Sequence, residues 1–126
     1  MATNPEDIAE VISRAAEVFD TPGQAVIGTD LAGEITFWNV GAKKLYGWSA
    51  EEACGRDILD VTPSAISRKQ GAEIMGKLQS GLSWTGEFAV KDRNGMEFVV
   101  RVQDLPVHSP TGRLIGVVGI SERVKS

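Results

Sequence analysis

The sequence is poor in the side chains that carry redox and metal chemistry. It has one cysteine, Cys54, and one histidine, His108, in 126 residues. A single cysteine cannot form a disulfide within the chain, which fits a reducing compartment. A single histidine leaves too few ligands for a metal site and no serine–histidine–aspartate arrangement. No glycine-rich phosphate loop is present either, so we expect neither a metal site nor a catalytic centre.

Long apolar runs and clusters of basic residues are also missing. No stretch approaches the roughly 18 apolar residues of a membrane span, and residues 1–7 lack the basic start of a signal peptide. The net charge of −4 and the scattered lysines and arginines argue against a nucleic-acid partner. With 42% apolar residues in a chain of one-domain length, we expect a cytoplasmic domain with its own core and no membrane partner.

The first predicted element is an amphipathic helix over residues 5–19. Pro5 suits the first helical position, and apolar residues then recur at helical spacing. The resulting stripe consists of Ile8, Val11, Ile12, Ala15, Val18 and Phe19. Either this stripe packs on the domain's own core, or it is shared with a second copy in a homodimer. We therefore divide the chain into an N-terminal helix, 1–21, and a domain, 22–126.

From residue 24 onward the apolar period changes to alternation, which predicts a hairpin of strands over 25–29 and 34–38. Short helical segments are predicted next, at 39–46, 49–52 and 57–61. Asn39 is a suitable cap for the first of them and Gly47 a suitable stop. The second begins with a capping-box pattern.

A longer helix is predicted over 63–80. It contains Gly71 and Gly76, each of which costs about 1 kcal/mol relative to alanine.

Strands are predicted over 82–91, 96–107 and 114–120. Two strands and three strands separated by helices indicate an α+β domain, in which the helices cover one face of an antiparallel sheet. A hollow between the sheet and these helices is the natural ligand site.

Four short motifs occur in order along the chain. They are Asp30-x-x-Gly33-x-Ile35-x-x-x-Asn39, Gly47-Trp48-Ser49-x-Glu51-Glu52-x-x-Gly55-Arg56, Trp84-x-Gly86-Glu87 and Asp92-x-x-Gly95. Together they resemble the PAS family of sensory domains, from about Gln24 to Glu122. The resemblance implies a five-stranded antiparallel sheet in the order 2-1-5-4-3 and a ligand-gated switch rather than an enzyme.

The resemblance also brings cofactors into question. Several members of the family hold haem through a histidine on the long helix, but residues 63–80 contain none and His108 lies in a polar turn, so we expect no haem. Related photosensors carry a flavin-reactive cysteine after a Gly-Arg-Asn step, whereas Cys54 precedes Gly55. We therefore expect no cysteinyl flavin and predict no cofactor. A redox flavin against Trp38, Trp84 and Asn39 stays open, although these residues also suit core and cap positions.

The predicted walls of the hollow come from both layers. The strands would supply Ile27, Ile35, Phe37, Phe88, Val100 and Val117, and the helical side Leu45, Ile58, Leu59, Ile66, Ile74, Met75 and Leu78. Thr36, Arg101 and Gln103 are the polar groups expected nearby. Either these side chains fill the hollow completely, or they hold a small apolar ligand such as a fatty acid.

Taken with the resemblance, these features predict a sensory domain of a cytoplasmic signalling protein. It would dimerise through the N-terminal helix and control an output domain in the same chain. That output could be a histidine kinase, a serine phosphatase, a cyclic-nucleotide enzyme or a transcription factor. The alternative is a protein-interaction domain that binds no ligand.

Overall fold

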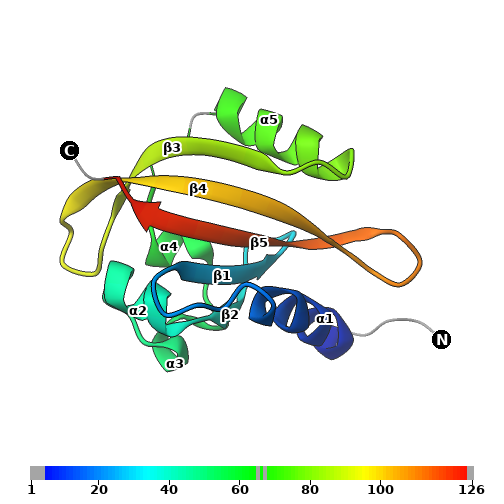
Figure 1. The fold of residues 1–126 in the computed structure, drawn as a ribbon, viewed down its shortest axis with the longest axis horizontal. Helices are drawn as coiled ribbons and strands as arrows, with labels where there is room; N and C mark the ends of the chain where they lie inside the picture. The colour runs from blue at the N-terminus through cyan, green and yellow to red at the C-terminus, as the bar shows by residue number, and fades with distance from the viewer. Residues whose placement is uncertain (1–4, 65, 67, 125–126) are drawn as a thin grey trace.

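The computed structural model describes residues 5–64, 66 and 68–124. Its helices are α1 (Pro5–Glu17), α2 (Val40–Tyr46), α3 (Ala50–Ala53), α4 (Ile58–Val61) and α5 (Arg68–Gln79). Its strands are β1 (Ala25–Asp30), β2 (Ile35–Trp38), β3 (Trp84–Lys91), β4 (Glu97–His108) and β5 (Leu114–Arg123). The strands form one antiparallel sheet in the order β2-β1-β5-β4-β3 (Figure 1), which confirms the predicted topology.

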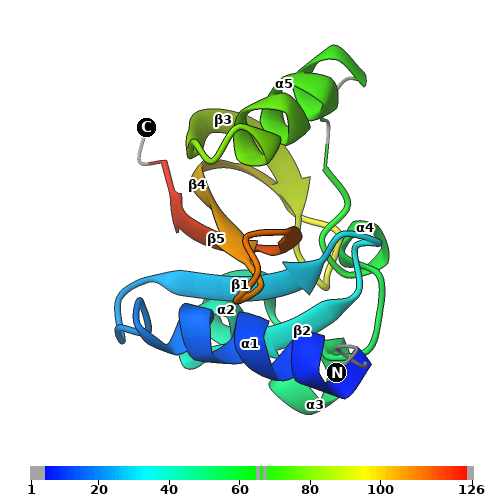
Figure 2. The same ribbon diagram turned by 90° about the vertical axis from the view of Figure 1, so that its right-hand side faces the viewer.

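The two faces of the sheet carry different helices. Figure 2 shows α1 lying along β1 and β2, while α5 lies beside β3 at the other end of the molecule. Side chains alternate between the faces along β5, so that Val117 packs with the core under the short helices and Val118 packs with α1. The prediction of short helices on one face, with a flanking N-terminal helix, is thereby confirmed.

The three hairpin turns share one local geometry, which explains the Asp-x-x-Gly pattern. The first residue of each turn accepts a hydrogen bond through its side chain from the backbone N–H four positions later; these residues are Asp30, Asp92 and Ser109. The fourth residue is a glycine at positive φ, namely Gly33 at 91°, Gly95 at 81° and Gly112 at 87°. Glycine adopts this backbone conformation without steric cost.

The long helix begins later than the sequence predicts. We expected it over 63–80, but α5 spans Arg68–Gln79. Thr62 instead ends α4, because its N–H and hydroxyl both donate to the Ile58 carbonyl. Ser64 then forms an isolated bridge with Val90, and the Pro63 carbonyl accepts the Lys91 N–H at 3.0 Å. Pro63 and Ser64 are thus paired with β3 before the helix starts; positions 65 and 67 lie outside the described residues.

Helix α1 is seated on its own sheet through Ile12, which is fully buried. A Cβ added to Gly116 of β5 would lie 2.5 Å from the Cδ1 atom of Ile12, and one added to Gly28 of β1 would lie 2.9 Å from its Cγ2 atom. The two glycines therefore let the helix approach the sheet closely. No helix in the part of the chain that the structure describes is long and apolar enough to span a membrane.

The predicted dimer stripe is divided by this packing. Its members Ile8, Val11, Ile12 and Ala15 all contact the cluster between α1 and the sheet. The helix ends at Glu17, two residues before the predicted end, and leaves Val18 79% exposed and Phe19 37% exposed. The interpretation that the stripe packs on the domain's own core therefore holds for its first four members. A role in a homodimer stays a prediction.

Candidate functional site

A cavity of about 220 Å³ lies between the sheet and the helices that cover its inner face. Strands β1, β3, β4 and β5 line one side, and α2, α4 and α5 with the segment before α5 line the other. Nine of the predicted wall residues contact it: Ile27, Ile58, Leu59, Ile66, Ile74, Met75, Leu78, Phe88 and Val117. The structure thus brings together residues from both layers, as expected; whether they contact a ligand stays a prediction.

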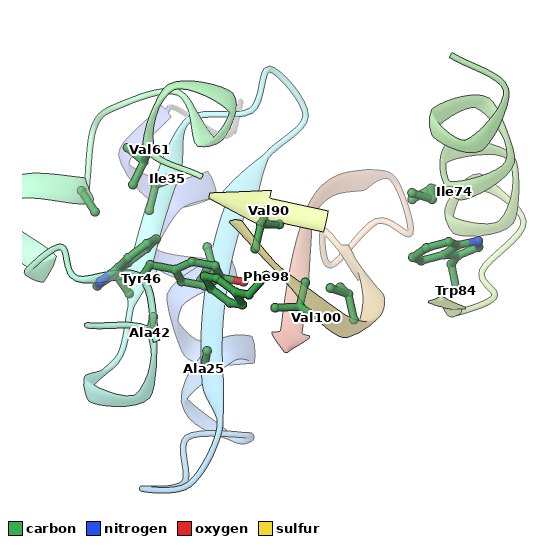
Figure 3. Packing of buried hydrophobic residues seen from close by; sticks show 14 of the residues in the cluster. Ala25, Ile35, Ala42, Tyr46, Val61, Ile74, Trp84, Val90, Phe98 and Val100 are labelled. Carbon is green, nitrogen blue, oxygen red and sulfur yellow. The ribbon is translucent and has the colours of Figure 1, made fainter. Parts of the chain in front are cut away.

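Three other predicted wall residues belong to the solid core beside the cavity. Ile35 and Val100 are essentially fully buried there, and Leu45 packs against the same cluster. Figure 3 shows Tyr46 and Phe98 next to one another in this core, with ring centroids 6.1 Å apart. Ile35, Val100 and Leu45 therefore pack within the core and do not line the cavity.

Phe37 is the one predicted wall residue that points away from the cavity. It packs in the cluster between α1 and the opposite face of the sheet. In the β1–β2 pair, Phe37 lies opposite Gly28 but Ile35 lies opposite Thr29, so the register shifts between these positions. A β-bulge of this kind inserts an extra residue and breaks the simple alternation of faces. The prediction that Ile35 and Phe37 share a face was therefore wrong.

The prediction that Thr36, Arg101 and Gln103 lie near the ligand site was also wrong, because none of them lines the cavity. Arg101 and Gln103 are exposed on the outer face of β4, where Arg101 forms an ion pair with Glu87 at 2.9 Å. The Thr36 hydroxyl donates to the Gly28 carbonyl and does not line the cavity. The cavity instead takes its strongest polar group from Asp104, which the sequence analysis did not single out.

The position of Asp104 follows from the alternation along β4. Phe98, Val100 and Val102 are buried on the inner face of this strand, and the next residue of the same parity is Asp104. An acidic residue that continues a buried series was a signal in the sequence that could have identified it. Gly119 lies opposite it on β5, and a Cβ at Gly119 would approach the Asp104 Oδ1 atom to 3.1 Å. The absence of a side chain there leaves room for the carboxyl.

The Asp104 carboxyl has no hydrogen-bond or ion-pair partner among the described residues. Its burial raises the pKa of Asp104 from 3.8 to about 7, because ionising a carboxyl away from water is costly. The group therefore changes its charge near neutral pH, inside an otherwise apolar cavity.

Of the five hydroxyl residues that line the cavity, Tyr46 and Ser121 form a pair, and Thr29, Thr62 and Ser64 are the others. The Tyr46 hydroxyl from α2 and the Ser121 hydroxyl from β5 are hydrogen-bonded to one another at 3.0 Å. Burial, and to a smaller extent the nearby charge of Asp104, raise the pKa of Tyr46 to about 12. Tyr46 therefore stays protonated across the physiological range, and Asp104 is the titrating group of the site.

Comparison with known proteins shows the family to which this architecture belongs. The PAS fold family model matches residues 14–124. The chain belongs to the PAS family. PAS domains are generally sensory rather than catalytic, so this one is a sensory or regulatory domain. No curated protein sequence matched it.

Solved PAS structures share the fold. The PAS domain of a protein from Colwellia psychrerythraea is 25% identical with a TM-score of 0.69, and the alignment covers 90% of this chain and 97% of that one. The PAS domain of an HTR-like protein from Haloarcula marismortui is 18% identical, with a TM-score of 0.68 and coverage of 94% and 96%. A fungal LOV-domain photoreceptor is 20% identical, with a TM-score of 0.66 and coverage of 83% and 77%.

The residues considered for a flavin have other roles in this PAS domain. The Trp38 indole N–H donates to the Trp48 carbonyl at 2.8 Å, and the ring of Trp84 folds over Gly86, where a Cβ would lie 2.4 Å from it. Asn39 is buried and caps α2 by accepting the Ala42 N–H at 2.8 Å. None of Trp38, Trp84 and Asn39 lines the cavity, and Cys54 is exposed outside it. Trp38, Trp84 and Asn39 therefore do not form the flavin contact set that was considered for them.

Proposed function

We propose that this PAS domain senses a compact, largely apolar small molecule that binds in the cavity between the sheet and α5. The observation that carries the proposal is the cavity itself, about 220 Å³ and walled mainly by aliphatic side chains of both layers. A cavity of about 150 Å³ is enough to bind benzene, so the volume suits one ring with a short substituent.

The size and the polar group both narrow the ligand class. Pockets for drug-sized molecules start at roughly 300 Å³, above the volume of this cavity. A compact ligand is therefore better supported than a long fatty acid or a flavin. A fatty-acid carboxylate would in addition meet Asp104, the one acidic group on the cavity wall.

Strand β5 offers a route from the cavity to the N-terminal helix. Val117, Gly119 and Ser121 line the cavity from this strand, while Val118 and Ile120 on its other face pack with α1. We infer that ligand binding shifts β5 and thereby α1, which passes the signal to an output domain in the same chain. Homodimerisation through α1 belongs to this proposal.

Filling the cavity tests the proposal. Val117→Phe adds volume inside the cavity, at a typical cost of about 1–3 kcal/mol that an ordinary domain survives. Val99→Phe is the matched control, because Val99 is 42% exposed and lies on the outer face of β4. Titration with ethylbenzene, followed by NMR shifts of the cavity amides, should show binding to the wild type and the control but not to Val117→Phe. Equal binding by Val117→Phe would contradict the proposed site.

Native mass spectrometry separates this proposal from the alternative. A stoichiometric small-molecule mass on the purified domain supports sensing. A domain without any bound mass that also fails to bind ethylbenzene supports the ligand-free interaction domain. A stoichiometric visible absorbance band would instead indicate a flavin or a haem.

A further inference from the structure

The unpartnered carboxyl of Asp104 is the feature of the cavity that the packing of the domain does not explain. We propose that Asp104 makes the cavity selective for a compact organic cation, an apolar body that carries one protonated amine. This inference rests on the proposed function of the cavity and names its ligand class.

The charges around the cavity favour a cation. Asp104 is the only charged residue among the described residues that line it, and Tyr46 is the only other titratable group there. The basic residues Arg68, Lys69 and Lys77 of α5 are exposed and do not line the cavity. Asp104 is half-buried, and its carboxyl faces the cavity with enough loss of water to raise its pKa. A carboxylate withdrawn from water is normally paired with a cation or hydrogen-bonded. Because no lysine or arginine of the described residues fills this role, a ligand cation has an open place.

The hydrogen-bonding groups beside Asp104 suit an ammonium group. An ammonium has three N–H donors and no acceptor. The carboxylate oxygens and the Tyr46–Ser121 hydroxyl pair supply acceptors on one side of the cavity. The aliphatic residues Ile74, Met75 and Leu78 of α5 supply an apolar wall for the rest of the ligand. The cavity thus offers acceptors for the charged end and apolar surface for the body.

The affinity of the cavity should change with pH in opposite directions for cationic and anionic ligands. Burial raises the pKa of Asp104 to about 7, whereas an alkylammonium group loses its proton only at about pH 10. Between pH 6 and pH 8 the ionised fraction of Asp104 rises about tenfold while the amine keeps its charge. A cation should therefore bind more tightly as the pH rises over this range, and a carboxylate ligand less tightly.

Three probes of similar size and different charge test the inference. Phenethylamine, 3-phenylpropionate and ethylbenzene are titrated into the whole chain at pH 6 and pH 8, with NMR shifts of the cavity amides as the readout. At pH 8, phenethylamine should bind at least tenfold more tightly than 3-phenylpropionate, which corresponds to about 1.4 kcal/mol. Its affinity should rise up to about tenfold from pH 6 to pH 8.

Asp104→Asn keeps the side-chain shape and removes the charge. It should weaken phenethylamine binding at least tenfold at pH 8, remove its pH dependence and abolish its advantage over 3-phenylpropionate. Asp60→Asn is the matched control, because Asp60 is an exposed acidic residue of α4 that does not line the cavity. It should behave as the wild type, which would show that net charge alone does not decide the affinity.

The outcomes separate this inference from the proposed function. If ethylbenzene binds but the amine has no advantage over the carboxylate, or keeps it in Asp104→Asn, the cation selectivity is wrong and the sensory cavity stands. If none of the three probes shifts the cavity amides, the cavity is not a ligand site and both conclusions fall.

Discussion

Asp104 couples the stability of the domain to pH, because its carboxyl ionises in different ranges in the folded and unfolded chain. Its pKa is about 7 in the folded domain and 3.8 ordinarily. Between these values the folded state binds the proton and the unfolded state does not. The free energy of unfolding therefore falls as the pH rises from about 4 to about 7, by at most about 4 kcal/mol from this group.

Asp104→Asn should remove this loss of stability. We expect the variant to be more stable than the wild type at pH 8, and the difference in unfolding free energy to shrink at pH 5. Urea denaturation followed by circular dichroism at the two pH values measures it. Asp60→Asn, with no burial to relieve, should follow the wild type. An Asp104→Asn variant whose advantage does not change with pH would contradict the raised pKa.

Asp104 also shows why the polar residues of the cavity were not predicted from the sequence. The residue types of Arg101 and Gln103 suggest polar cavity groups, but their parity on β4 places them on the outer face. Alternation along the strand predicted the inner face correctly, because Val100, which was predicted on that face, is fully buried there, although it packs beside the cavity and does not line it. A carboxyl in the same series departs from the usual preference of acidic residues for water, so the residue type of Asp104 concealed a role that its parity on β4 indicates.

At the scale of the elements, Gly76 of α5 occupies a helical position with open space around it. A Cβ added there would meet nothing within 4 Å, and the residue has no positive φ. Gly76→Ala should therefore raise the free energy of unfolding by about 0.5–1 kcal/mol through helix propensity alone. Thermal denaturation measures the change. A destabilised variant would show that α5 requires the flexibility of glycine.

Gly116 of β5 should respond in the opposite direction. A Cβ at this position would lie 2.6 Å from the Thr29 carbonyl oxygen as well as 2.5 Å from the Cδ1 atom of Ile12. Gly116→Ala should therefore lower the free energy of unfolding by about 1–3 kcal/mol and loosen α1. Denaturation and limited proteolysis within α1 report the two effects. Protection of α1 equal to that in the wild type would mean that the helix is not held at this contact.

The elements that the sequence predicted well are those determined locally. Asn39 caps α2, Gly47 ends it in the left-handed conformation, and the capping box at Ser49 and Glu52 begins α3. Two errors arose where pairing with another strand changes the local structure. The bridge between Ser64 and Val90 delays the start of α5, and the bulge opposite β1 turns Phe37 to the other face. Neither pairing leaves a periodic signal in the segment that it changes.

At the scale of the whole molecule, the sheet is a shared wall between the cavity and α1. Ile12 and Ala16 of α1 are fully buried against its outer face. Deleting the helix would therefore expose the sheet's own core and confuse a loss of folding with a loss of assembly. The proposed homodimer has to use apolar side chains that this packing leaves free. Val18 and Phe19, directly after α1, are the members of the predicted stripe that remain exposed.

Charges at these two positions provide the test of the dimer. Val18→Glu combined with Phe19→Glu should convert a particle of twice the 13.5 kDa chain mass into a monomer, because burying two unpaired carboxylates in an interface is costly. Light scattering measures the mass, and circular dichroism should show an unchanged fold, since neither residue belongs to the cluster under α1. Val40→Glu on α2, 62% exposed, is the control and should remain dimeric. A monomeric wild type, or a dimeric double variant, would place the assembly surface elsewhere or show that the domain works as a single copy.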